Sequence, residues 1–258
     1  ENHKLGTLII LHVITREKSV ERLKTEFLAI VAHQLRTPLS AIKWTLKMFL
    51  DGDMGKFSET QIDFLGKIYD NNERMINLVN DLLNITRIEE GRFLQKTQEC
   101  DFVDLLQEVA SSVEDVVKKK SLKFNLILPN KDSPKINVDK EKIILAMQNL
   151  LDNAINYTKV GIVTFTGEYN VDKKEFFVTV QDTGIGIPKN QNERVFSRFF
   201  RSSSAVKTET EGTGLGLFIA KNIIEAHGGK IWFESVEGQG TTFSFSLPLK
   251  GIASKKLK

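Results

Sequence analysis

The stretch Asn149-Leu-Leu-Asp-Asn153-Ala-Ile-Asn-Tyr157 ends a run with helical periodicity that predicts a long helix over 140–157. Asn149 and Asn153 are four residues apart and therefore share one face of that helix. Two amides on a helix that is expected to be largely buried need partners, because a buried amide without hydrogen bonds is costly. A magnesium–phosphate cluster would supply these partners, since Mg²⁺ accepts neutral oxygen ligands. An asparagine pair on the protein surface is the alternative interpretation.

A first glycine-rich stretch, Asp182-Thr-Gly184-Ile-Gly186-Ile, comes directly after a strand predicted over 176–181. Glycines at alternate positions allow positive φ and the close approach of a planar ligand. The Asp182 carboxylate can accept a hydrogen bond from an exocyclic amine. These features indicate a binding site for a base, and an ordinary glycine-rich turn is the alternative.

A second glycine-rich stretch, Gly212-Thr-Gly214-Leu215-Gly216-Leu, opens a helix predicted over 215–227. Backbone N–H groups at a helix N-terminus, made accessible by glycines, form a cradle for phosphate. The spacing GxGxG differs from the GxGxxG of dinucleotide sites, and no GK[ST] follows it. Both a Rossmann site and a P-loop are therefore disfavoured.

The first third of the chain carries a different pattern. Apolar residues recur at steps of three and four over 19–50, which predicts a long amphipathic helix. The glycine-containing stretch 51–56 breaks this pattern, and Ser58 with Gln61 has the spacing of a capping box at the start of a second helix. One antiparallel hairpin leaves its apolar stripe uncovered, so we expect two hairpins to associate as a dimeric four-helix bundle.

The remaining predicted elements alternate irregularly, which favours an α+β two-layer sandwich over a doubly wound parallel sheet. An isolated strand is expected over 6–15, where it would pair with a larger sheet or another chain. The stretch 188–212 has little apolar periodicity. The further expected elements are a helix over 105–117 and strands over 123–128, 162–169, 230–235 and 242–247.

Composition excludes several classes of protein. The 258 residues carry 36 Lys and Arg against 33 Asp and Glu, and a net charge of +3 favours neither nucleic acid nor an anionic membrane as the partner. Cys100 is the single cysteine, which rules out an internal disulfide framework and a zinc site with several thiolates. No apolar stretch approaches the roughly 20 residues of a membrane span. Because the chain opens at Glu1 without Met, we expect a fragment or a processed form of a longer protein.

The order of these motifs resembles the cytoplasmic core of bacterial sensor histidine kinases, whose ATP-binding domain has the Bergerat fold. The stretch Phe27-Leu-Ala-Ile-Val-Ala-His33-Gln-Leu-Arg-Thr-Pro-Leu39 resembles the phosphoacceptor box of that family. The stretches at Asn149, Asp182 and Gly212 resemble its N box and its two glycine boxes. Two further motifs, Phe196-Ser-Arg-Phe-Phe-Arg201 and Gly238-Gln-Gly-Thr-Thr-Phe243, resemble its F box and its closing strand motif. The resemblance covers about residues 17–249.

The resemblance implies ATP and Mg²⁺ as cofactors. Asp182 would bind the adenine amine, and Asn149 would coordinate Mg²⁺. Asn153 and the backbone at 214–216 would hold phosphate. The stretch 188–212 would form a mobile lid over ATP. Tyr157 would pack near the base, Arg201 would steady the γ-phosphate, and Phe196, Phe199 and Phe200 would serve as latch and core. The other implied binding positions are Gly184, Gly186, Gly212, Gly214, Leu215 and Gly216, whereas His227, before Gly228 and Gly229, is interpreted as a structural helix C-cap.

The resemblance makes His33 the phosphoacceptor, which would pass its phosphoryl group to an aspartate on a response-regulator receiver domain. An imidazole with an ordinary pKa near 6.5 is largely neutral at pH 7, and only a neutral ring nitrogen can attack phosphorus. Pro38 lacks an N–H and would clash with the carbonyl of Gln34, so we expect the helix to bend beside His33. A histidine partly buried in the bundle is the alternative interpretation.

Three positions near these groups affect the expected chemistry. Gln34 stands where many relatives carry Glu or Asp, and glutamine can accept a hydrogen bond from the imidazole but brings no charge. We therefore expect autophosphorylation slower by about one to two orders of magnitude. Thr37 keeps the polar side chain with which the family orients water to dephosphorylate the regulator. Asn156 replaces a lysine common in the N box, which leaves one phosphate contact open.

Two alternative functions remain. An ATPase of the same fold, from the chaperone or mismatch-repair branches, would have no use for His33 and the Arg36-Thr-Pro38 that follows it. A dimeric scaffold that binds ATP without autophosphorylating is kept open by Gln34.

The expected organisation has four parts: 1–18 as a strand and linker resembling the end of a PAS sensor domain, 19–91 as the dimerisation and phosphotransfer hairpin, 92–249 as the ATP-binding domain, and 250–258 as a basic tail. The expected partners are a second copy of the chain and a receiver domain, with no nucleic acid and no membrane contact in this chain. The expected location is the cytoplasm, with any membrane anchor of the full-length protein upstream.

Overall fold

The computed structural model describes residues 15–89, 97–129, 134–208 and 212–249, and for 15–22, 24–26 and 207 it describes the backbone alone. The chain divides into two compact units between Glu89 and Glu90. The predicted domain boundary at 91/92 and the predicted strand over 6–15 fall outside the described residues, except for Thr15, which begins a helix.

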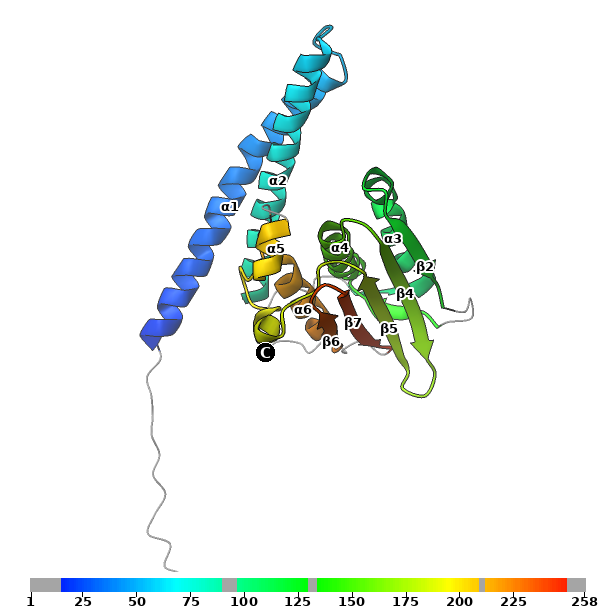
Figure 1. Cartoon of the computed structure of the whole chain (residues 1–258). Coiled ribbons are helices and arrows are strands. Elements are labelled where there is room, and N and C mark those ends of the chain that lie inside the picture. Colours follow the sequence, from blue (N-terminus) through cyan, green and yellow to red (C-terminus); the bar gives the residue numbers. More distant parts are fainter. Residues whose placement is uncertain (1–14, 90–96, 130–133, 209–211, 250–258) are drawn as a thin grey trace, which may run out of the picture. The chain divides into compact units, whose positions relative to one another are not determined.

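The first unit is a hairpin of two long helices, α1 (Thr15–Leu50) and α2 (Glu59–Glu89) (Figure 1). Helix α1 continues through Pro38, and the bend expected there stays a prediction. The capping box that begins α2 is confirmed. Ser58 N donates to Gln61 Oε1 at 2.9 Å, while Gln61 N donates back to Ser58 Oγ at 3.3 Å.

Polar contacts tie the two helices of the hairpin together. Lys43 Nζ lies 2.9 Å from the Glu73 carboxylate, and the buried Asn72 donates from Nδ2 to the carbonyl of Leu39 at 2.9 Å. The hairpin buries few apolar side chains of its own and leaves many exposed. The exposed large apolar side chains are Leu23, Phe27, Ile30, Leu35, Ile42, Trp44, Met48, Met54, Ile62, Phe64, Ile68, Met75 and Leu78.

The second unit contains a five-stranded sheet in the order β2-β4-β5-β7-β6, in which β2 and β4 are parallel and the other neighbours are antiparallel. Its strands are β2 (Lys123–Ile127), β4 (Ile162–Asn170), β5 (Glu175–Asp182), β6 (Lys230–Val236) and β7 (Gly240–Pro248). Helices α3 (Phe102–Lys119), α4 (Lys140–Tyr157) and α6 (Gly216–Ala226) complete the main part of the unit. This is the α+β architecture predicted from the sequence.

Three shorter features complete the unit. The strands β1 (Gln98–Cys100) and β3 (Ile136–Val138) form a separate antiparallel pair, which the sequence did not predict because each has only three residues. Between β5 and α6 lie a short 3-10 helix, η1 (Lys189–Arg194), and a short helix, α5 (Ser203–Thr208). Both fall in the stretch 188–212 that lacked apolar periodicity.

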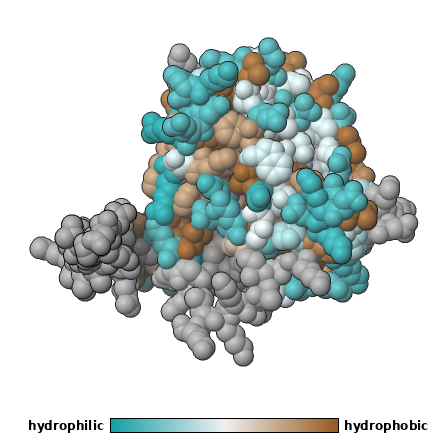
Figure 2. All heavy atoms as spheres, turned by 90° about the horizontal axis from the view of Figure 1, so that it is seen from below, coloured by the Kyte–Doolittle hydropathy of each residue, from teal (hydrophilic) through white to brown (hydrophobic). Residues whose placement is uncertain are grey.

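The core of this unit lies between one face of the sheet and the three main helices. Residues of β4 and β5 alternate between buried and more exposed positions, as expected for a sheet covered on one face. Phe102 of α3 packs on Phe176 of β5 with ring centroids 4.1 Å apart, and Phe165 and Phe245 are fully buried. Among the residues that Figure 2 colours, hydrophobic ones are interspersed with hydrophilic ones on the face it draws.

Candidate nucleotide site and phosphoacceptor

The predicted asparagine pair lies where the start of α6 meets α4. Asn153 Nδ2 donates to the carbonyl of Asn149 at 2.7 Å. Among the described residues the buried Asn149 Nδ2 has no hydrogen-bond partner, and a Cβ on Gly216 would lie 2.8 Å from Asn149 Oδ1. The fold therefore brings the amide of Asn149 against the second glycine-rich stretch, about 67 residues further along the chain. A buried amide without a partner, beside a phosphate cradle, fits a ligand of the magnesium–phosphate type.

Asp182 ends β5, and its side chain is only 6% exposed. Its Oδ1 accepts the N–H of Gly184 at 2.8 Å and that of Thr241 at 3.2 Å. Burial raises the pKa of the Asp182 carboxyl from its ordinary 3.8 to about 6, and the two backbone hydrogen bonds oppose this rise only in part. In the described part of the chain no donor bonds Oδ2, so this oxygen is left for an amine of a ligand.

The loop after Asp182 is closely packed and depends on glycine. Gly186 has a φ of +64°, and a Cβ there would collide with the carbonyl oxygen of Val236. A Cβ on Gly184 would collide with the carbonyl oxygen of Tyr157, which accepts the N–H of Ile185 at 3.2 Å. The loop therefore lies against the end of α4, where Tyr157 is half-buried, and the expected packing of Tyr157 near the base stays a prediction.

The second glycine-rich loop leads directly into α6. Gly214 has a φ of +67°, and a Cβ there would approach Phe199 C at 2.8 Å and Phe200 O at 2.9 Å. Leu215 is buried, and its N–H donates to Thr213 Oγ1 at 3.2 Å. These contacts hold the loop so that the N-terminal turn of α6 begins at Gly216. Such a turn presents backbone N–H groups and the positive end of the helix dipole to an anion.

The segment from Phe196 to Arg201 packs on this loop and on α6. The guanidinium carbon of Arg201 would lie 3.3 Å from a Cβ on Gly212, so Arg201 lies at the predicted phosphate end of the site. The Arg198 guanidinium lies 4.7 Å from the ring centroid of Phe218, and the Lys221 ammonium lies 5.7 Å from that of Phe196. Cation–π contacts of this kind tie the predicted lid to α6.

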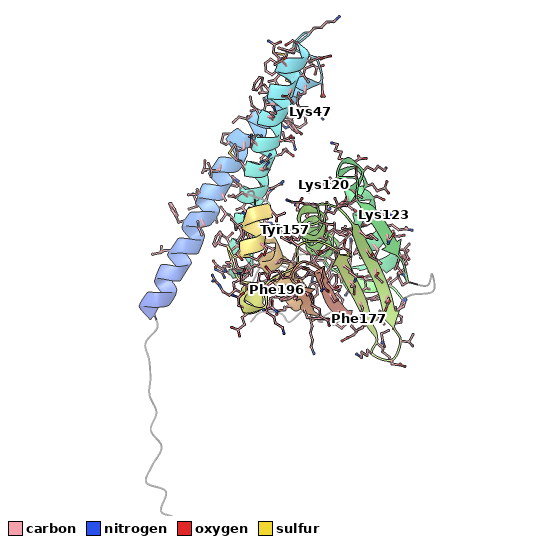
Figure 3. All side chains as sticks on the ribbon, viewed as in Figure 1. Lys47, Lys120, Lys123, Tyr157, Phe177 and Phe196 are labelled. Carbon is pink, nitrogen blue, oxygen red and sulfur yellow. The ribbon has the colours of Figure 1, made fainter. Side chains whose placement is uncertain are left out.

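The three phenylalanines of this segment differ in their surroundings. Phe196 packs edge-on against Phe233 and Phe243 of the sheet, with ring centroids 5.8 Å and 6.2 Å away (Figure 3). Phe196 is half-buried in this aromatic cluster, which agrees with the expected role in latch and core. Phe199, in contrast, is 65% exposed and has a φ of +58°, so it is not a core residue. The sequence could not separate the two, because both are aromatic residues in a stretch without periodicity.

His33 lies on α1 in the first unit with its side chain exposed, and Gln34 and Thr37 are exposed as well. In a single hairpin His33 is exposed, which favours the phosphoacceptor interpretation over a histidine partly buried in the bundle. Arg36 Nη2 donates to Asn80 Oδ1 and so joins α1 to α2 one turn from His33. His33 belongs to the first unit, and the glycine loops belong to the second.

Three residues outside the predicted set bear on the site. Thr241 donates its backbone N–H to Asp182, and Ser235 bonds the hydroxyl of Thr241. Lys120, at the end of α3, extends toward α4 and donates to Asn156 Oδ1 at 2.7 Å (Figure 3). A lysine therefore does reach position 156, although from another helix. The register of β6 with β7 could have indicated Ser235, but nothing in the sequence indicated Lys120.

Two further observations limit what the chain can hold. Among the described residues, no three His, Cys, Asp or Glu side chains are grouped so that they could bind a metal ion. A metal at Asn149 would therefore depend on oxygens of a bound phosphate as its other ligands. No helix in the described ranges is long and apolar enough to cross a membrane.

Comparison with protein families agrees with this geometry. Residues 138–251 match the family of histidine kinase-, DNA gyrase B- and HSP90-like ATPases, and residues 23–91 match the His Kinase A (phospho-acceptor) domain. The sensor histidine kinase WalK of Bacillus subtilis (strain 168) is 35% identical over 246 residues, which are 95% of this chain and 40% of WalK. The chain thus spans less than half the length of that relative.

Solved structures of similar proteins include the catalytic domain of histidine kinase ThkA, which is 34% identical with a TM-score of 0.53 and covers 60% of this chain and 97% of its own. Full-length ShkA in complex with AMPPNP is 26% identical with a TM-score of 0.69, over 89% of this chain and 47% of ShkA. ThkA in complex with the response regulator protein TrrA is 27% identical with a TM-score of 0.59, over 93% of this chain and 68% of the other.

An ATPase domain of this type that follows a phosphoacceptor hairpin defines the core of a histidine kinase. The sequence and structural matches cover both units and agree on this class. The chain belongs to the sensor histidine kinases of two-component systems.

Proposed function

We propose that this chain transfers the γ-phosphoryl group of Mg-ATP to His33 and then to an aspartate of a response regulator. The observation that carries the proposal is the presence, in one chain, of an exposed His33 on a phosphoacceptor hairpin and a buried carboxylate, Asp182, beside glycine loops. A carboxylate at a base site and a phosphate cradle at a helix start are the two ends of a nucleotide site.

In the proposed complex the base lies at Asp182, whose Oδ2 accepts an N–H of the adenine amine. The phosphates lie at the start of α6, where the N–H groups that follow Gly214 face them, and Arg201 offsets their charge. Asn149 would hold Mg²⁺ through its side-chain oxygen, and Asn153 would contact phosphate. The buried Asn149 Nδ2, which has no partner among the described residues, would then donate to a phosphate oxygen. When bound, Mg²⁺ would neutralise charge that develops on the phosphate oxygens.

At the hairpin, a neutral ring nitrogen of His33 attacks the γ-phosphorus, and the bond from that phosphorus to the bridging oxygen breaks. ADP departs with the bridging oxygen, and His33 retains the phosphoryl group. Gln34 accepts a hydrogen bond from the other ring N–H of His33 but adds no charge. Regeneration of the histidine follows when a carboxylate of the regulator takes the phosphoryl group. In a second reaction, the dephosphorylation of the regulator, Thr37 orients the attacking water.

The hairpin supports a dimer as the acting form. Its exposed apolar side chains include Phe27, Trp44 and Phe64, each more than 60% exposed within one chain. Association of two hairpins into a four-helix bundle would bury this surface. We expect light scattering of the purified chain to report a dimer, and charged substitution of Phe64 to produce monomers.

The proposed partner is a receiver domain, since the similar kinase ThkA was solved with the response regulator protein TrrA. The proposed organisation keeps the hairpin at 19–91 and the ATP-binding domain at 92–249, in a cytoplasmic portion of a longer sensor. Nucleic acid has no place in this proposal.

One alternative retains support from a specific residue. With Gln34 beside the phosphoacceptor, the chain would bind ATP and dimerise without phosphorylating itself. The two functions are separated by incubating the chain with ATP labelled on the γ-phosphate. Label retained on the protein supports the kinase, and nucleotide binding without label on the protein supports the scaffold.

A further inference from the structure

Ser235 lies near the end of β6, and its hydroxyl bonds in three directions. It accepts the N–H of Ile187 at 2.8 Å, donates to the carbonyl of Gly240 at 3.0 Å, and lies 2.9 Å from Thr241 Oγ1. A hydroxyl has one proton to donate and two lone pairs that accept. Since its proton is used on Gly240, the hydroxyl of Thr241 donates to Ser235. The hydrogen-bonding capacity of Ser235 is then fully used.

The partners of Ser235 come from two segments that meet at Asp182. Ile187 ends the glycine-rich loop that follows Asp182 in the chain. Gly240 and Thr241 begin β7, and Thr241 lies directly opposite Ser235 in the register of β6 with β7. Thr241 also donates its N–H to Asp182 Oδ1 at 3.2 Å. One hydroxyl thus links the loop after Asp182 with the strand that bonds the Asp182 carboxylate.

We infer that Ser235 is a positioning residue for base recognition, because it holds the glycine-rich loop and the N–H of Thr241 at a fixed spacing about the Asp182 carboxylate. This inference rests on the proposed nucleotide-binding function. It concerns a residue that does not touch the nucleotide and acts through Thr241 and Ile187.

The packing around these segments leaves little room for another arrangement. A Cβ on Gly186 would collide with the carbonyl oxygen of Val236, and a Cβ on Gly240 would collide with that of Asp182. Gly238 N also donates to the carbonyl of Ile185 at 2.8 Å. Because the backbones are this close, a change in the hydrogen bonds of Ser235 would be passed on to the loop that carries Gly184 and to Thr241, whose N–H groups both donate to Asp182.

The pKa of Asp182 depends on its surroundings, so such a change can be measured as a shift of that pKa. Burial is the largest influence on its pKa, and the N–H groups of Gly184 and Thr241 oppose it, without a contribution from any charged side chain. The titratable groups packed around the loop are Tyr157 of α4 and Glu237 of the β6–β7 turn, and Glu237 accepts from Ser204 at 3.3 Å. Loss of the Thr241 bond would therefore raise the pKa of Asp182 further.

The test compares Ser235→Ala with Ser235→Thr and with a matched control, Ser244→Ala. Ser244 lies on the neighbouring β7 and bonds Thr179 at 3.3 Å, away from Asp182. Affinities for adenosine, ADP and ATP are measured by calorimetry between pH 5 and 8. We expect Ser235→Ala to weaken all three by the same factor, about fivefold to tenfold, because the change lies at the base end. We also expect the pH at which affinity is half lost to move upward.

Ser235→Thr keeps the hydroxyl and should retain wild-type affinity and pH dependence, as should Ser244→Ala. If Ser235→Ala does not fold, Thr241→Val removes one partner of the hydroxyl and should move the pH midpoint in the same direction. An unchanged midpoint in a folded Ser235→Ala or Thr241→Val variant would overturn the inference. A wild-type chain that binds no adenine nucleotide would instead contradict the proposed function.

Discussion

The imidazole of His227 accepts the backbone N–H of Asp139 at 3.0 Å, across 88 residues of chain. Its other ring nitrogen, Nδ1, lies 2.8 Å from the carbonyl of Ile223 and therefore carries the proton. The bond joins the C-cap of α6 to the N-cap of α4, the two helices that bring Gly216 to Asn149. The structural role predicted for His227 at the end of its helix is confirmed.

This neutral form of His227 makes stability depend on pH. Burial lowers the pKa of His227 below its ordinary 6.5, so the folded protein binds this proton more weakly than the unfolded chain. The contribution of His227 to the free energy of unfolding is complete above pH 6.5. It is lost as the pH falls below 6.5. Urea unfolding between pH 5 and 8 should show that His227→Gln removes this part of the pH dependence.

His33→Gln, which changes an exposed histidine, is the matched control and should leave the pH dependence of unfolding as in the wild type. Parallel curves of unfolding free energy against pH for the wild type and His227→Gln would show that the bond to Asp139 does not couple to protonation.

Asp182→Asn should stabilise the free protein and weaken nucleotide binding. Because the pKa of Asp182 is raised to about 6, its ionised form costs stability, and the cost appears as the pH rises from about 4 through 6. Removing that charge should raise the unfolding free energy at pH 7 by roughly 2 kcal/mol. Loss of the charged acceptor should weaken ATP binding by about 10- to 100-fold.

Asp172→Asn, in the exposed β4–β5 turn, is the control and should change neither the unfolding free energy nor the affinity for ATP. In the wild type, ATP affinity should fall as the pH decreases below about 6, since a protonated Asp182 cannot accept in the same way. Destabilisation by Asp182→Asn, or ATP affinity independent of pH in this range, would argue against the role given to this carboxylate.

Gly240→Ala should disrupt the base end of the site. Gly240 has a φ of +114°, and its Cβ would collide with the carbonyl oxygen of Asp182. Strain and displacement together should cost about 2–4 kcal/mol in unfolding free energy and should eliminate nucleotide binding. Gly66→Ala is the control, because this helical glycine of α2 has open space around its Cβ position and should stabilise by about 0.5–1 kcal/mol. Retention of ATP binding in Gly240→Ala would contradict the close approach of β7 to Asp182.

Gln34→Glu should accelerate autophosphorylation by about one to two orders of magnitude, because a carboxylate would stabilise the charge that develops on His33. The rate of label incorporation at saturating ATP is the measurement. Gln107→Glu, exposed on α3, makes the same chemical change elsewhere and should have no effect. Equal rates for the wild type and Gln34→Glu would remove Gln34 as the reason for slow transfer.

Long elements with strong periodicity were predictable from the sequence. Helix α4 has the predicted bounds, and the Ser58–Gln61 capping box fixed the start of α2 to within one residue. The glycine stretches were expected to allow the close approach of a ligand, and the structure shows that other backbones approach closely at Gly184 and Gly186. Three-residue strands such as β1 and β3 carry too few residues for a pattern.

Contacts between distant segments were not predictable in the same way. The donation from Lys120 to Asn156 depends on how α3 and α4 pack, and the link from Ser235 to Ile187 depends on which strand borders β7. The resemblance implied a role in latch and core for Phe199 together with its two neighbours, whereas Phe199 has a φ of +58° and is 65% exposed.

The most direct test of the account is the fate of label from γ-labelled ATP in the wild-type chain, in His33→Ala and in His12→Ala. A phosphoryl group on an imidazole nitrogen is lost in acid and retained in base, unlike one on serine or threonine. The account predicts acid-labile label on the wild type and on His12→Ala, and none on His33→Ala that still binds ATP. Acid-labile label that persists in His33→Ala would contradict it.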